Sequence, residues 1–227
     1  MFIGHYGIGF ALKKVEPGLS LGLLIFGAVM LDILFGVFLL AGFEHAKIAP
    51  GATVVSPFEF YDYPISHSAV GAVVWAAVGF LAYWLWPKGD RASRKIPAFV
   101  LAAAIFSHFI LDVISHTPDL TIFGNNSPKL GLSLWNSLGG TIIVEMGIFF
   151  VGVILYRRAT KSVSSSGKYG LVLMVLILMV FYIGNTFGPP PPDMISVGVI
   201  STAGQLALVA LAFWVDRNRI TIQPAKS

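Results

Sequence analysis

Three residues with metal-binding side chains, His108, Asp112 and His116, follow one another at intervals of four within an apolar segment. In an α-helix with about 3.6 residues per turn, such residues lie on one face, each turned from the last by about 40°. Imidazole nitrogens and carboxylate oxygens presented from successive turns can bind zinc at about 2.0–2.2 Å. The spacing therefore predicts a metal site. A hydrogen-bonded polar stripe between packed helices fits the same spacing and stays open as an alternative.

The composition places this segment in a membrane. Hydrophobic residues make up 56% of the 227 residues and charged residues only 11%, and the mean hydropathy is +0.81. Soluble domains carry roughly 25% charged residues, so this chain cannot cover a water-facing surface. These values exclude a cytosolic enzyme, a secreted domain and a disordered chain. A charged residue at membrane depth costs at least about 2.5–3.5 kcal/mol on insertion scales and therefore needs a partner.

The elements that must position these residues are apolar segments of about 20 residues, the length of a helical membrane span. Proline and glycine residues, which interrupt helices, mark the ends of these segments, most clearly at 188–192. We expect an all-α polytopic membrane helical bundle with about six transmembrane helices, at residues 19–41, 67–86, 96–116, 136–156, 169–187 and 195–215. Residues 1–227 are expected to form a single integral membrane domain, in which 1–156 holds the metal-site helices and 169–215 supplies two packing helices.

The basic residues predict the orientation of these segments. Thirteen of the fifteen Lys and Arg residues, Lys88 and Lys226 among them, fall in loops on one side of the predicted bundle, and only Lys47 and Lys129 fall on the other. Because cytoplasmic loops carry an excess of Lys and Arg, both termini are expected in the cytoplasm. The chain is thus predicted to be a multi-pass protein of the inner (plasma) membrane.

Further ionisable residues converge on the depth of His108 and Asp112. With a rise of about 1.5 Å per residue, Asp32 lies about 20 Å and His108 about 18 Å from the cytoplasmic start of its segment. His67 stands at the outer end of the second segment, and Glu145 lies about 14 Å below the outer start of the fourth. A borderline cation such as zinc would select such histidines and acids. A proton or ion relay in a carrier, or structural polar contacts, would use similar residues.

His5 lies in an apolar, glycine-rich segment that precedes Lys13 and Lys14. The eight residues from His5 to Lys13 span about 12 Å as a helix or about 26 Å when extended, which is enough to approach Asp32. Such a segment can fold back into the bundle where protein buries it. Without that re-entry, His5 is an interfacial residue.

Three other polar residues are expected to have minor roles. His45 is interpreted as a solvated loop residue. Asp119 is interpreted as a hydrogen-bond partner for an imidazole or as a turn residue at a helix end. Gln205 is expected to pair helices.

The order of these motifs resembles that of the bacterial inner-membrane metal-dependent hydrolases. The motifs are a histidine near the start, a mid-helix aspartate, His67-Ser68 at the start of a helix, and then His-x-x-x-Asp. That family is similar in turn to the zinc-dependent phospholipase C and single-strand nuclease group of all-helical phosphodiesterases. The resemblance covers residues 1 to about 150. Two departures stand out: Met30-Leu31-Asp32 replaces the Pro-Asp-x-Asp-His run that is common in the membrane family, and Thr141 occupies the place of a histidine that binds a third ion in the phospholipases.

The resemblance implies a set of metal ligands: His5, Asp32, His67, His108 and Asp112, with His116 and Glu145 as ligands of a further ion. Asp112 would bridge two ions, and Asp112 and Asp32 would be the catalytic carboxylates. The implied cofactor is a divalent metal, zinc or else manganese.

The implied function is metal-dependent hydrolysis of a phosphoester or lipid-like substrate near the outer face of the membrane. The expected partners are the lipid bilayer and a small-molecule or lipid substrate. No nucleic acid is expected, because no run of basic residues with interleaved aromatics forms a patch. The alternative is an ion-coupled carrier or a non-catalytic membrane scaffold with a polar or metal-binding core.

Overall fold

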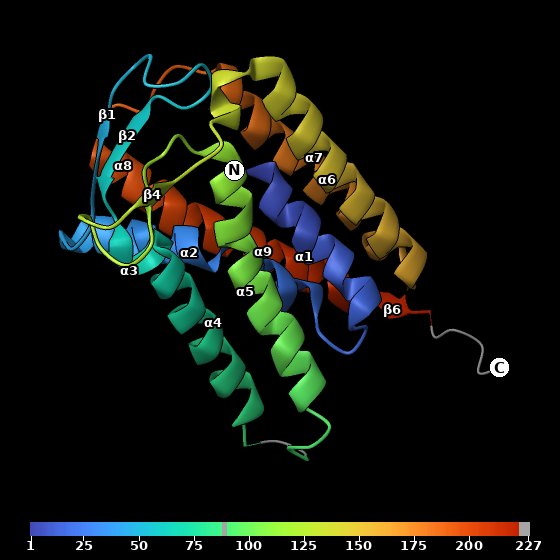
Figure 1. Ribbon diagram of the computed structural model, residues 1–227. Helices are drawn as coiled ribbons and strands as arrows, with labels where there is room; N and C mark the ends of the chain where they lie inside the picture. Colours follow the sequence, from blue (N-terminus) through green and yellow to red (C-terminus); the bar gives the residue numbers. More distant parts are fainter. Residues whose placement is uncertain (88–89, 223–227) are drawn as a thin grey trace.

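The apolar segments of the sequence form the long helices of the computed structural model, which describes residues 1–87 and 90–222 (Figure 1). Local signals set the helix ends. The Ser20 side chain accepts a hydrogen bond from the Leu23 amide at the start of α2, and Gly42 ends this helix in a left-handed conformation, with φ of 74°. The helices are α1 (Ile3–Val15), α2 (Leu21–Ala41), α3 (Pro64–His67), α4 (Ala69–Trp84), α5 (Lys95–Ser115), α6 (Leu138–Ala159), α7 (Ser165–Phe187), α8 (Met194–Val199) and α9 (Gln205–Arg217). The expected all-α class is confirmed.

Over the described part of the chain, five helices are long and apolar enough to cross a membrane: α2, α5, α6, α7 and the continuous helix Met194–Arg217. That last helix joins α8 to α9 through a π turn at Ile200–Gly204. The segment expected at 67–86 differs from the prediction, because Ser68 is extended and separates the single turn of α3 from α4, which has only 16 residues. The sequence thus predicted the positions of the five membrane-length helices, overestimated the length of α4 and did not predict α1.

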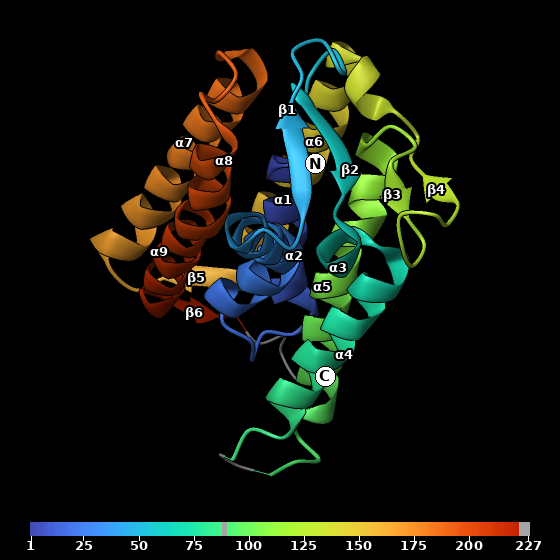
Figure 2. The ribbon, with the colours of Figure 1, turned by 90° about the vertical axis from the view of Figure 1, so that its left-hand side faces the viewer.

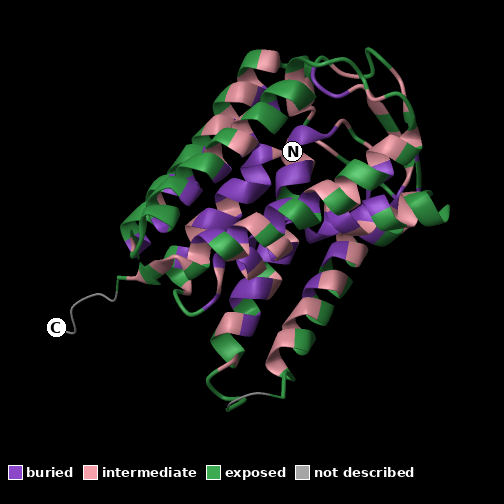
Figure 3. Ribbon diagram, turned by 180° about the vertical axis from the view of Figure 1, so that it is seen from behind, coloured by how far each residue is buried: buried purple, intermediate pink, exposed green. Residues whose placement is uncertain are grey.

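The segment around His5 folds back into the bundle, which is the first of the two positions that the sequence allows for it. His5 is 1% exposed. α1 packs along α6 at two glycines: a Cβ atom on Gly152 would lie 2.0 Å from the backbone oxygen of Gly7. Most of α1 is buried, whereas in α4 only Ala72 and Ala76 are buried and the other residues are exposed or partly exposed (Figure 3). The close approach of the two helices fixes α1 in the centre of the molecule.

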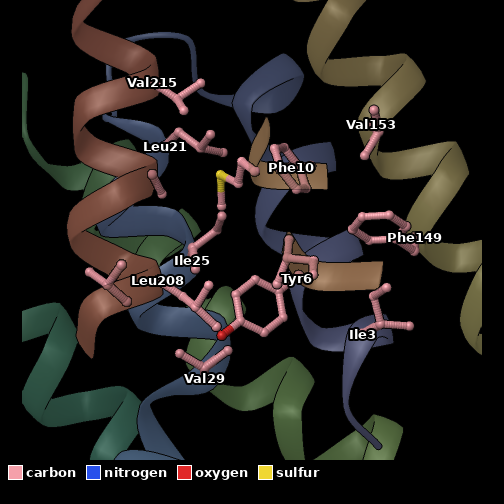
Figure 4. Close-up of a cluster of buried hydrophobic side chains, with 14 of the residues drawn as sticks. Ile3, Tyr6, Phe10, Leu21, Ile25, Val29, Phe149, Val153, Leu208 and Val215 are labelled. Atoms are coloured by element: carbon pink, nitrogen blue, oxygen red, sulfur yellow. The ribbon is translucent and has the colours of Figure 1, made fainter. Parts of the chain in front are cut away.

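An apolar core holds α1 against its neighbours. Tyr6 and Phe10 of α1 pack with Phe149 of α6, Ile25 of α2 and Leu208 of α9 (Figure 4). All but Leu208 are fully buried, and that residue is 6% exposed. Helices from both the first and the last part of the chain therefore position α1.

A buried ion pair lies at the far end of α1. Lys13 Nζ donates to Asp216 Oδ2 at 2.8 Å and to the Leu19 carbonyl at 2.7 Å. Asp216 also accepts hydrogen bonds from the Leu21 amide and the Tyr156 hydroxyl. The pair of Lys13, which counts among the cytoplasmic loop residues in the sequence, and Asp216 therefore connects α1, α2, α6 and α9.

Short strands connect the helices, and the described residues form three two-stranded sheets. β1 (His45–Ile48) pairs with β2 (Phe58–Asp62), and β3 (Leu120–Thr121) pairs with β4 (Lys129–Leu130). Figure 2 shows the β1–β2 hairpin beside α8 and above α2. At the other end of the bundle, β5 (Thr160–Ser162) pairs with β6 (Arg219–Thr221). Lys88 and Lys226, which enter the orientation argument, lie outside the described residues.

Candidate metal centre

Five residues from four helices meet around Asp112. Its Oδ1 lies 3.2 Å from His5 Nε2, and its Oδ2 lies 3.0 Å from His108 Nε2 and 3.6 Å from His67 Nε2. Asp32 Oδ1 completes the cluster at 3.6 Å from His108 Nε2 and 3.7 Å from His67 Nε2. Two sets of potential ligand atoms each lie within 4.8 Å of one another: His5, Asp32 and His108, and His67, His108 and Asp112. The structure thus brings together five of the seven metal ligands that the sequence predicts, and leaves His116 and Glu145 outside these two sets.

The helix α5 contributes two of these residues because their spacing of four places them on its buried face. His108 is fully buried, and its Nδ1 lies 2.8 Å from the Ala28 carbonyl oxygen. Since a carbonyl oxygen only accepts, Nδ1 carries the proton. In the neutral ring Nε2 then has a free lone pair that faces the carboxylates of Asp112 and Asp32.

A hydrogen-bonded chain orients His67 in the same way. Glu44, which is fully buried, accepts bonds from the backbone amides of Ile65 and Ser66 at 2.7 and 2.8 Å and from the Ser66 hydroxyl at 2.6 Å. Because the one hydroxyl proton of Ser66 is used in this bond, Ser66 Oγ accepts from His67 Nδ1, 2.7 Å away. His67 Nε2 is therefore left as an acceptor toward the cluster. Histidines that bind metals characteristically donate their other nitrogen to such a partner.

The donor atoms fit a divalent cation. His5 Nε2 and His108 Nε2 are buried within 3.2 and 3.0 Å of Asp112 oxygens, yet neither contact has hydrogen-bond geometry. A lone pair that faces a carboxylate is repelled unless a cation lies between them. A set of imidazole nitrogens and carboxylate oxygens suits zinc and related ions. The described residues can therefore hold a metal ion.

The last membrane-length helix also reaches the cluster. Gln205, the first residue after the π turn, donates to Asp32 Oδ2 at 3.3 Å, and it accepts from the hydroxyl of Tyr6. π turns inside α-helices are frequent at functional sites. Gln205, expected only to pair helices, thus joins α1 to a carboxylate of the candidate centre.

His116 lies at the edge of the cluster. Its Nε2 is 4.0 Å from Asp112 Oδ1, and its Nδ1 is 3.0 Å from Asp119 Oδ1. The Tyr63 hydroxyl donates to the same Asp119 oxygen at 2.7 Å, and Trp135 lies against the imidazole with ring centroids 4.2 Å apart. Burial and the nearby Asp119 carboxylate raise the pKa of Tyr63, so its hydroxyl remains a donor. Asp119 therefore has the role of imidazole partner that the sequence allows for it.

Glu145 faces the start of α1. Its Oε2 accepts from the backbone amides of Phe2 and Gly4 at 2.9 and 3.3 Å. The Met1 amine donates to Asp112 Oδ1 at 2.6 Å. The hydroxyl of Thr141 donates to the Leu134 carbonyl at 3.0 Å. Glu145 and His116 are outside the two ligand sets, although both line the cavity next to Asp32 and Asp112.

Several of the residues that organise the centre are not evident in the sequence. Glu44 lies in a segment that the sequence indicates is a solvated loop. Its neighbour His45 is half-exposed, and its Nδ1 lies 2.8 Å from Asp62 Oδ2. The one available signal is that Glu44 is an isolated acid directly after an apolar helix. Gln205 gives a clearer signal, because it is a polar residue within a membrane-length helix.

The comparisons with known proteins assign this chain to no family. No family model, curated protein or solved structure matches the chain. The functional argument therefore depends on the geometry of the centre.

Proposed function

We propose that this protein is a membrane-embedded metal-dependent hydrolase that acts on a phosphoester or lipid-like substrate. One observation carries the proposal: five buried or half-buried ligand side chains form two sets of three that share His108, and hydrogen bonds to Ala28 and Ser66 turn two imidazole nitrogens toward the carboxylates. Zinc is the proposed ion, and manganese is the second candidate, because both accept nitrogen and carboxylate ligands.

The cation would supply Lewis acidity, which polarises a phosphoryl or ester oxygen and activates water for attack. The protein itself supplies the remaining functions. Asp112 is common to most contacts of the cluster and would be the central carboxylate that holds the cation. Asp32 is the other catalytic carboxylate, held by Gln205 at the wall of the cavity. His116, with Asp119 on its Nδ1, can exchange a proton with a substrate at the cavity edge.

We restrict the proposed centre to the five residues around Asp112. His116 and Glu145 are outside the two ligand sets, and Glu145 Oε2 already accepts from the backbone amides of Phe2 and Gly4. Through these bonds Glu145 stabilises the start of α1, because a carboxylate there satisfies amides that lack helical partners.

The proposed location is the inner (plasma) membrane, with six spans and both termini in the cytoplasm. Five helices have sufficient length and hydropathy, and α4 would be the short sixth span. The excess of basic residues on one side supports this orientation. In this topology His67 and the β1–β2 hairpin are at the outer face, which agrees with a substrate that is met there.

The test is a hydrolysis assay on the protein in lipid nanodiscs. A panel of phosphodiesters, phosphomonoesters and lipid esters is supplied with zinc or manganese. We expect turnover that a chelator abolishes and that Asp112→Asn removes, whereas His45→Ala, in an exposed residue outside the cluster, retains it. Metal-independent ion uptake into vesicles, without hydrolysis of any substrate, would instead identify an ion-coupled carrier.

A further inference from the structure

The cavity at the metal centre continues into a second, larger cleft. The second cleft, here called the loop cleft, lies between residues 50–58 on one side and residues 180–192 with α8 on the other. The two spaces share part of their walls, including Val55, Phe58, Phe181, Asn185 and Ile200. Figure 2 shows the β1–β2 hairpin facing α7 and α8 in this region. The two spaces therefore adjoin, and a ligand that occupies both would reach from Asp112 into the loop cleft.

The volumes of the two spaces indicate that a complete substrate needs both of them. The cavity beside the metal centre has a volume of about 180 Å³, whereas the loop cleft has about 710 Å³. Binding sites for complete small molecules measure roughly 300–1,000 Å³. The inner cavity therefore accommodates only the reacting part of a substrate, and the loop cleft has room for the rest.

The walls of the loop cleft define the chemistry of that remaining part. They are formed largely by valine, phenylalanine, isoleucine and proline side chains, and no charged residue is among the described residues that line them. Four polar residues of the cleft, Ser56, Asn185, Thr186 and Ser201, lie on the wall that both spaces share, and Thr53 is the one polar side chain among the described residues that lines the loop cleft alone. The polarity thus decreases from the carboxylates and imidazoles of the centre to the far end of the cleft.

The cleft also adjoins a surface suited to the hydrocarbon of a bilayer. Val180 is 70% exposed and Ile200 is 58% exposed, and both belong to membrane-length helices. Apolar side chains in such positions face lipid at little cost. An apolar chain can enter the loop cleft sideways between α7 and α8 while its polar end moves toward Asp112.

We propose that the loop cleft binds the apolar chain of a membrane amphiphile, with the polar head of the same molecule at the metal centre. This inference rests on the proposed hydrolase for the role of the head. The proposal adds a separate site, the loop cleft, that recognises the length and apolarity of the ligand's chain instead of a charge.

Two glycines provide matched variants for a test. A Cβ atom on Gly184, in the wall of the loop cleft, would meet no atom within 4 Å, so Gly184→Trp places an indole in the cleft without a backbone clash. Gly147 of α6 is equally open, and it lines neither the inner cavity nor the loop cleft. Gly147→Trp therefore makes the same change at an exposed helical position elsewhere.

The experiment uses photolabelling in nanodiscs of phosphatidylglycerol and phosphatidylethanolamine. The probe is phosphatidylglycerol with a diazirine at the end of one acyl chain, and labelled peptides are identified by mass spectrometry. Residues 50–58 form a loop and the first residue of β2, outside the membrane-length helices, so we expect them to meet the chain end when it occupies the cleft. We expect labelling of 50–58 in the native protein and in Gly147→Trp, and a decrease of about tenfold or more in Gly184→Trp, since an obstructed site commonly loses that much occupancy.

Equal labelling of 50–58 in all three proteins, or labelling confined to lipid-facing residues of α4, would overturn the proposal. If Gly184→Trp does not fold, Gly184→Leu and Gly147→Leu replace the pair. Bound metal is measured on the same samples. Gly184-dependent labelling without bound metal supports the cleft and contradicts the hydrolase, whereas bound metal without Gly184-dependent labelling contradicts the cleft alone.

Discussion

The imidazole rings of His5 and His108 stack in parallel, with centroids 3.7 Å apart and an angle of 1° between their planes. One ring comes from α1 and the other from α5, so the contact exists only because α1 is packed inside the bundle. Both rings approach the Asp112 carboxylate through Nε2. Two stacked imidazoles that face one carboxylate are an arrangement that a shared cation stabilises, and it is the structural basis of the predictions below.

The position of α1 depends on its close approach to α6 at Gly7 and Gly152. A methyl group on Gly152 would lie 2.0 Å from the Gly7 carbonyl oxygen, so Gly152→Ala must push the helices apart. We expect this variant to lower the melting temperature and to weaken metal binding, because His5 moves with α1. Gly147→Ala, in the same helix and in open space, is the control. Equal melting temperatures and metal affinities for the two variants would show that the crossing does not position His5.

Glu44 and Ser66 are expected to set the orientation of His67. Glu44→Gln retains an oxygen for the backbone amides but replaces the acceptor of the Ser66 hydroxyl, so the proton arrangement along Glu44, Ser66 and His67 is disturbed. Loss of such a partner typically weakens metal affinity about 10–100-fold. The measurement is a competition titration of zinc against a chromophoric chelator.

The control for Glu44 is Glu59→Gln, which changes an exposed carboxylate paired with Lys47 at 3.0 Å. Ser66→Ala should weaken binding to a similar extent as Glu44→Gln, since it breaks the same chain. A zinc affinity of Glu44→Gln equal to that of Glu59→Gln would exclude this positioning role.

Gln205 and Tyr6 are expected to act as a unit on Asp32. Gln205→Leu removes the donor to Asp32 Oδ2, and Tyr6→Phe removes the hydroxyl that holds the Gln205 side chain. Each variant should weaken zinc binding by about tenfold, and the double variant by little more than Gln205→Leu alone, because residues in one hydrogen-bonded network are not additive. Fully additive losses in this double-mutant cycle would show that Tyr6 does not act through Gln205.

The sequence predicts those parts of the fold and site that depend on local patterns. Helical spacing placed His108 and Asp112 on one face, and glycine-rich composition allowed the re-entry of His5. The Glu44–Ser66 contact and the Asp32–Gln205 contact were not predicted, because they depend on how distant segments pack. The burial of Lys13 was missed for the same reason, since its partner Asp216 is in the last helix. The β1–β2 hairpin gave no distinct signal in a segment interpreted as a loop.

The central claim is that the five residues around Asp112 bind a metal ion, and the most direct test is the metal content of the purified protein. Protein in detergent is analysed by mass spectrometry for zinc and manganese, in the native form, in His45→Ala and in the double variant His108→Ala with Asp112→Ala. A centre built from these five residues predicts at least one firmly bound ion per chain in the first two proteins and almost none in the double variant. A native content below about 0.2 ion per chain that the double variant leaves unchanged would contradict a site whose ligands should bind the ion tightly.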